Sequence, residues 1–77
     1  MIDAEQIRDL LVSERLVAKP ELAVDEPLVS SGLLDSLNIM GLVALIETKF
    51  SVSIPDEVLR PSNFESCTAL AASLADL

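Results

Sequence analysis

The sequence predicts an all-α fold: a small four-helix bundle of three principal helices and one short helix, with a long loop between helices one and two. Apolar residues recur at helical spacing in three separate stretches. Hydrophobic residues make up 51% of the chain, yet the aromatic ones are only Phe50 and Phe64. Such an aliphatic core suits packed helices better than a small β-barrel. At 77 residues the chain is near the lower size limit for one self-sufficient core, so we expect residues 1–77 to form a single domain.

The first helix is expected to run from about Ala4 to Val17. Asp3 and Gln6 have the spacing of a capping box, in which each side chain accepts a hydrogen bond from the backbone of the other residue. Apolar residues follow at helical spacing: Ile7, Leu10, Leu11 and Val17. Lys19-Pro20 then breaks the pattern, because proline lacks the N–H that a helix interior requires.

A long connection leads from this helix to Leu34. Pro27 and the run Ser30-Ser31-Gly32 prevent it from forming one continuous helix. Long connections in small domains are usually either functional or pinned by apolar anchors. The candidate anchors are Leu22, Val24, Leu28, Leu33 and Leu34.

The second helix is predicted from Ser36 to about Phe50, with Asp35 as its N-cap and Pro55 beyond its end. Laid out at about 100° per residue, it has two apolar faces. The broad face is expected to line the core: Ile39, Leu42, Val43, Ile46 and Phe50. The narrow face, here called the apolar stripe, borders Ser36 and comprises Leu37, Met40 and Ala44.

The apolar stripe has two interpretations. Small exposed apolar patches beside polar residues often mark docking sites, and methionine adapts to several partners. Alternatively, the loop of residues 30–34 or the short third helix covers the stripe. Gly41, beside it, costs roughly 1 kcal/mol relative to alanine inside a helix. This glycine indicates either a close approach to the backbone or a tolerated residue.

The segment after the second helix contains Pro61 and Asn63, which predict irregular chain over residues 56–64 and one short helical turn near Ser62–Glu65. The last helix is expected to open at Ser66 or Cys67. Its leucines recur at helical spacing: Leu70, Leu74 and Leu77. Cys67 is interpreted as a small packing residue.

Composition excludes several classes of function. Thirteen acidic and five basic residues give a net charge of −8, which opposes binding to nucleic acid or anionic membranes and favours partners with basic surfaces. The charge alternatively serves solubility alone. Without histidine and with one cysteine, the usual nucleophile–base pairs and zinc sites cannot be assembled, so we expect neither an enzyme nor a metal site. The absence of a leader pattern or membrane-length apolar run predicts a cytoplasmic protein.

Ser36 is the candidate functional residue. It follows the N-cap Asp35 and occupies the first helical position, where backbone amides lack helical partners and the helix dipole is positive. A phosphate ester on its hydroxyl would be stabilised there. Alternatively, Ser36 is simply a tolerated first-turn residue.

From Ile7 to the C-terminus the chain resembles the acyl carrier protein family, with its aminoacyl and peptidyl relatives. The resemblance is carried by three ordered segments: Gly32-Leu33-Leu34-Asp35-Ser36-Leu37, Val52-x-Ile54-Pro55-Asp56-Glu57 after Phe50, and Pro61-Ser62-Asn63-Phe64-Glu65-Ser66. It implies that a separate transferase attaches 4′-phosphopantetheine from coenzyme A to Ser36. The thiol of this arm would hold an acyl or aminoacyl group as a thioester, on a single carrier-protein domain.

The resemblance also implies recognition by loading and transfer enzymes. The matching carboxylates are Asp35, Glu47, Asp56 and Glu57, with Leu37 and Met40 as the apolar centre. Asn38 and Gly41 stand where strongly acidic fatty-acid carriers have carboxylates. This departure favours a carrier dedicated to one pathway, such as natural product biosynthesis or cell-surface modification, over a housekeeping fatty-acid carrier. The protein is expected to be a monomer. The other alternative is an unmodified helical adaptor that binds or dimerises through the apolar stripe.

Overall fold

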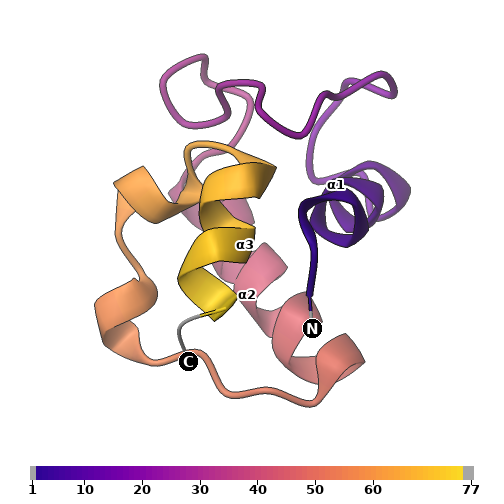
Figure 1. Cartoon of the computed structure of the whole chain (residues 1–77). Helices are drawn as coiled ribbons and strands as arrows, with labels where there is room; N and C mark the ends of the chain where they lie inside the picture. The colour runs from indigo at the N-terminus through magenta and orange to yellow at the C-terminus, as the bar shows by residue number, and fades with distance from the viewer. Residues whose placement is uncertain (1, 76–77) are drawn as a thin grey trace.

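The computed structural model describes residues 2–75, and within that range it is helical without any strand, which confirms the all-α class. The elements are α1 (Ala4–Ser13), α2 (Ser36–Phe50), the short 3-10 helices η1 (Asp56–Val58) and η2 (Pro61–Phe64), and α3 (Cys67–Ala75). The connection from α1 to α2 crosses one end of the helices, and the chain carrying η1 and η2 runs around to α3 (Figure 1). Within residues 2–75, none of the helices combines the length and the hydrophobicity that a membrane span needs.

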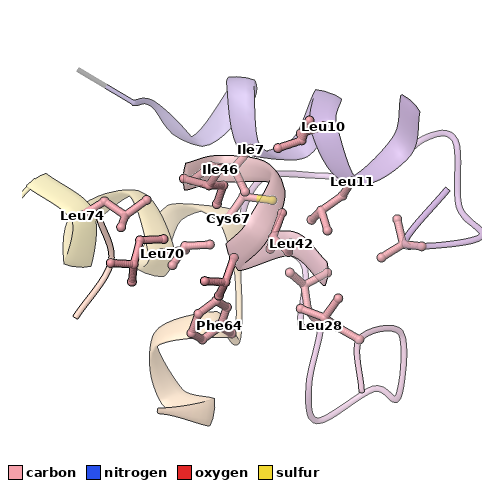
Figure 2. Packing of buried hydrophobic residues seen from close by; sticks show 14 of the residues in the cluster. Ile7, Leu10, Leu11, Leu28, Leu42, Ile46, Phe64, Cys67, Leu70 and Leu74 are labelled. Carbon is pink, nitrogen blue, oxygen red and sulfur yellow. The ribbon is translucent and has the colours of Figure 1, made fainter. Parts of the chain in front are cut away.

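The buried side chains form one apolar cluster between the three α-helices, with α1 packed against α3 and α3 against η2 (Figure 2). From the broad face of α2, Leu42, Val43 and Ile46 are buried, while Ile39 and Phe50 are half-buried at its edge. No polar or charged residue among those described is buried. Each fully buried leucine or isoleucine contributes about 1.5–3 kcal/mol, so hydrophobic burial dominates the packing.

The loop anchors predicted from sequence are confirmed. Leu22, Leu28 and Leu34 are buried, while Val24 and Leu33 pack against the cluster at its edge. The long connection is therefore fixed to the core at intervals along its length.

The helix α1 begins as predicted but ends earlier. Its capping box is present, with the Asp3 carboxylate accepting from the Gln6 N–H and the Gln6 side chain from the Asp3 N–H. The predicted end at Val17 is wrong, because Arg15 adopts a left-handed conformation with φ of 58°. The Leu16 N–H then donates to the Leu11 carbonyl and the Arg15 N–H to that of Val12. This is the Schellman arrangement that closes many helices.

The same arrangement explains why the end was missed. Glycine normally occupies the left-handed position, and Arg15 gives no such signal. Val17 is buried at 5% exposure although it lies beyond the helix, so its apolar spacing reflects burial rather than helical structure.

The segment between α2 and α3 contains two short helices where one was predicted. The predicted turn near residues 62–65 corresponds to η2, whereas η1 falls in a stretch predicted to be irregular. The η1 helix consists of single i→i+3 bonds from Val58 to Pro55 and from Leu59 to Asp56, too few residues to show a periodic pattern. The last helix opens at Cys67 as expected, and Leu77 lies outside the described residues.

Glu65 ties the long connection to the segment that leads into α3. One carboxylate oxygen, Oε1, accepts hydrogen bonds from the consecutive N–H groups of Leu28, Val29 and Ser30 at 3.1, 2.8 and 3.0 Å. The Glu65 carbonyl also accepts from the Leu28 N–H. Hydrogen bonds from Ser30, and then from Val29 and Leu28, hold the pKa of Glu65 below its ordinary value of 4.5. We call this arrangement the Glu65 clasp.

The lowered pKa of Glu65 predicts a defined acid sensitivity. The clasp contributes its full stability above the unfolded-state pKa of about 4.5 and loses it as the pH falls through the lower folded-state value. Glu65→Gln should therefore be less stable than the parent at pH 7 and should show a shallower loss of stability below about pH 4.5. Urea unfolding at several pH values measures both effects.

Glu57→Gln is the matched control, because the exposed Glu57 carboxylate accepts no hydrogen bond from any residue in the range 2–75. Equal pH profiles for Glu65→Gln and the parent would show that the clasp contributes nothing to stability.

The two glycines are expected to respond to alanine in opposite directions. A Cβ built on Gly41 would lie 3.7 Å from Leu16 Cδ2, an ordinary contact, so the suggested close approach to its backbone is absent. Gly41→Ala should raise the free energy of unfolding by about 0.5–1 kcal/mol, because alanine is the better helix former. Gly32 has φ of 82°, a left-handed conformation that alanine disfavours. Gly32→Ala should therefore lower the free energy of unfolding by about 1 kcal/mol. Two shifts of the same sign in urea unfolding would contradict this assignment.

Candidate functional site

Ser36 opens α2 behind a formed N-cap. Asp35 is extended, with φ of −105° and ψ of 178°, and its carboxylate accepts from the Asn38 N–H at 2.9 Å. The Asp35 carbonyl accepts the first helical bond, from the Ile39 N–H. Ser36 is exposed, as the sequence-based hypothesis requires.

Backbone hydrogen bonds and burial fix the residues that precede Ser36. Gly32 turns the chain with its positive φ, and its N–H donates to the Val29 carbonyl at 3.1 Å. Leu34 is 2% exposed, and its N–H donates to the Leu28 carbonyl at 3.0 Å. Because Leu28 also belongs to the Glu65 clasp, Ser36 follows a fixed backbone rather than a free loop.

The electrostatic surroundings of Ser36 combine donors and one carboxylate. Within residues 2–75, the backbone N–H groups of Ser36 and Leu37 donate to no acceptor, since the Asp35 side chain takes only the amide of Asn38. These free amides and the positive end of the 15-residue helix favour an anion at this point. The negative charge of the Asp35 carboxylate disfavours an anion at the same point.

A cavity of about 200 Å³ lies beside Ser36, between α2 and the chain around η2. It is lined by Ser36, Ile39, Met40, Leu59, Arg60, Pro61 and Phe64. Apart from Ser36 its walls are mainly apolar, and Arg60 is the cation among them. Nothing in the sequence pattern singles out Arg60, because residues 36 and 60 line one cavity only in the folded chain.

The apolar stripe is open. Leu37 is 80% exposed and Met40 is 56% exposed, and they are the large hydrophobic residues that stand out on the described surface. Ala44 is exposed as well. The alternative in which the loop or the short third helix covers the stripe is therefore wrong.

The four carboxylates predicted for partner recognition do not have equal environments. Asp35, Asp56 and Glu57 are exposed, the last two at the start of η1. Glu47 is half-buried, and its Oε2 accepts from the Ile54 N–H at 2.8 Å, which fixes the chain just after α2. Partner recognition by all four remains a prediction.

Asn38 explains one departure of α2 from strongly acidic carriers. It is half-buried, and its side-chain amide donates to the Leu16 carbonyl at 3.2 Å. An aspartate there would have no side-chain N–H to donate, so position 38 holds the start of the connection that follows α1 instead of presenting charge.

Cys67 has no exposed surface and belongs to the core. Burial raises the pKa of its thiol to about 11. The interpretation as a packing residue is consistent with both observations, since thiol reactivity requires the thiolate.

The described residues form an all-α structure that presents an exposed serine at a helix start, as the resemblance to carrier proteins requires. The family model described as "Phosphopantetheine attachment site" matches residues 5–74. A curated relative, the acyl carrier protein of Campylobacter hominis, is 35% identical over 52 residues, covering 68% of this chain and 66% of the relative, slightly under two thirds of its length. The chain belongs to the acyl carrier protein family.

A solved structure shares the fold. It is a chain in the crystal structure of an engineered Bradyrhizobium japonicum glycine:[carrier protein] ligase complexed with a carrier protein from Agrobacterium tumefaciens and ATP. The likeness has a TM-score of 0.81 and 24% identity, and covers 96% of this chain and 97% of the other. At this identity it establishes the architecture.

The family's prosthetic group is phosphopantetheine, and its members are carriers rather than catalysts. The described residues fit that group. Ser36 offers an exposed hydroxyl beside free amides, and the adjoining cavity combines apolar walls with a guanidinium. These features suit a chain that begins with an anionic phosphodiester and continues as a mostly uncharged arm.

Proposed function

We propose that this protein carries 4′-phosphopantetheine on Ser36 and presents an acyl or aminoacyl thioester to partner enzymes. The observation that carries the proposal is the exposed Ser36 between Asp35 and Leu37 at the start of α2, in a chain of the phosphopantetheine-attachment family. The arm supplies a terminal thiol when attached. The protein supplies a fixed attachment point and a recognition surface.

Attachment requires a separate transferase and coenzyme A. The Ser36 oxygen attacks the phosphorus that bears the pantetheine, forming one P–O bond while the bond to the adenosine bisphosphate breaks. The serine proton passes to a base of the transferase, and adenosine 3′,5′-bisphosphate leaves. Ser36 has no hydrogen-bonded general base among residues 2–75, which agrees with chemistry supplied by the partner.

Docking is proposed to occur on the face that carries the apolar stripe. Leu37 and Met40 supply exposed apolar contact next to the attachment point, and Asp35, Asp56 and Glu57 supply exposed negative charge. Exposed ion pairs are worth about 0.2–1 kcal/mol each, so they orient partners and speed encounter more than they hold them. Glu47 is expected to contribute less to docking, because its carboxylate already accepts a backbone hydrogen bond.

The pathway is proposed to be a dedicated one that loads an amino acid or an unusual acyl unit. Asn38 and Gly41 leave Glu47 as the one acidic residue of α2, unlike strongly acidic fatty-acid carriers. The structural neighbour gives a precedent for aminoacyl loading, because that carrier protein is crystallised with a glycine:[carrier protein] ligase.

The protein is further proposed to act as a monomer. The large exposed apolar side chains of the described surface are Leu37 and Met40, too little apolar area for the hydrophobic interface of an obligate dimer. This observation also weighs against an unmodified dimerising adaptor.

Ser36→Ala should abolish attachment of the arm. When the purified parent protein is incubated with coenzyme A and a broad-specificity phosphopantetheinyl transferase, its intact mass should increase by one prosthetic group, whereas the variant should gain none. Ser62→Ala is the matched control, because Ser62 is also exposed and its hydroxyl forms no hydrogen bond with the described residues. A parent protein that stays unmodified with a transferase active on another carrier would contradict the proposal.

Leu37→Ala should slow modification by the same transferase about fivefold to tenfold in kcat/KM, since it removes an exposed apolar contact of roughly 1 kcal/mol.

Asp56→Asn and Glu57→Gln should each slow modification by about two- to fivefold at low salt and have no effect at high salt. Glu21→Gln controls for net charge, because Glu21 lines a different hollow, beside α1. Equal kinetics for Leu37→Ala and Glu21→Gln would refute docking through the apolar stripe.

A further inference from the structure

Arg60 is a cation beside the attachment point. It lines the same cavity as Ser36, and its side chain is exposed. Within residues 2–75 the ion pairs are Arg8–Asp9 and Lys19–Glu26, so Arg60 is paired with no carboxylate there. A guanidinium without a partner at the mouth of a cavity is available for an anion.

Hydrogen bonds fix the backbone of Arg60 on both sides. Its N–H donates to the Val58 carbonyl at 2.8 Å, and its carbonyl accepts from the Asn63 N–H at 2.9 Å. Pro61 restricts the chain on the following side, and Arg60 is the residue that precedes η2. The guanidinium therefore extends from a defined point, and its reach is limited by its own side chain.

The local charge balance favours a counter-charge once Ser36 is modified. A phosphodiester on the Ser36 oxygen places a negative charge next to the Asp35 carboxylate, which already occupies the N-cap. The free amides of the first turn supply only partial positive charge. The nearest full positive charge among the cavity residues is that of Arg60.

We propose that Arg60 pairs with the phosphodiester of the prosthetic group and thereby orients the first part of the arm toward the cavity between α2 and η2. This inference rests on the proposed attachment at Ser36. A guanidinium matches two phosphate oxygens at once, which a lysine ammonium does not. Arg60 is thus a positioning residue: it sets the direction in which the arm leaves Ser36 and takes no part in the thioester chemistry.

The cavity walls strengthen this pairing. Ile39, Leu59 and Phe64 line the same hollow and exclude part of the solvent from one side of the ion pair. Partial exclusion of water raises the strength of an ion pair relative to a fully exposed one. The pair still faces solvent through Arg60, so it should respond to salt.

The test uses the modified protein with a free thiol and no cargo, its modification confirmed by intact mass. The phosphorus NMR resonance of the phosphodiester is recorded in phosphate-free buffer from about 10 mM to about 1 M NaCl, over which the screening length falls from about 30 Å to about 3 Å. In the parent protein the resonance should move with salt. In Arg60→Gln it should sit at a different position at low salt and move little, and Arg60→Lys should fall between the two.

Lys49→Gln is the matched control, because Lys49 is an exposed cation in the last turn of α2, about 20 Å from Ser36 at about 1.5 Å per residue. Its spectrum should follow that of the parent. A second measurement compares the side-chain Nε–H resonance of Arg60 before and after modification, and the proposal requires it to shift.

Identical phosphorus spectra for the parent and Arg60→Gln at low salt would overturn the proposal. That result leaves attachment at Ser36 intact, since the mass gain reports that step separately. A protein that gains no mass instead removes the proposed function itself.

Discussion

The position of Ser36 depends on the Glu65 clasp. Three consecutive backbone N–H groups of the connection between α1 and α2 donate to one carboxylate oxygen, which is the acceptor for Val29 and Ser30 and shares the Leu28 N–H with the Glu65 carbonyl. The buried Leu28 and Leu34 fix the same stretch from the core side. Hydrophobic anchors and a charged acceptor thus hold opposite sides of a connection that has no regular secondary structure of its own.

The short segment from residue 60 to residue 65 acts on the attachment point in two ways. Its last residue, Glu65, fixes the chain that enters Ser36, and its first, Arg60, lines the cavity next to the hydroxyl. Between them Phe64 is 1% exposed and fastens the segment to the core. The segment of residues 60–65 therefore both fixes the position of Ser36 and lines the cavity into which a group attached to Ser36 could extend.

Sequence reasoning succeeded where the determining interactions are local. The helix α2 was predicted with its observed limits, because Asp35 and the apolar periodicity lie within the helix or directly beside it. It failed at the end of α1, where Arg15 takes a conformation usually reserved for glycine. The clasp could not be predicted either: Glu65 is more than 30 residues from its donors, and those donors are backbone groups that every residue except proline possesses.

The chain's single cysteine bears on the proposed chemistry. A thioester is attacked by thiolates, so an accessible thiolate on the carrier could take the cargo from the arm. Cys67 has no exposed surface, and burial raises the pKa of its thiol to about 11, so near pH 7 it is neither ionised nor within reach. Packing in the core thus removes a competing nucleophile. For a carrier that must hold its cargo between partners, a buried cysteine at the start of α3 offers the thioester no competing thiolate.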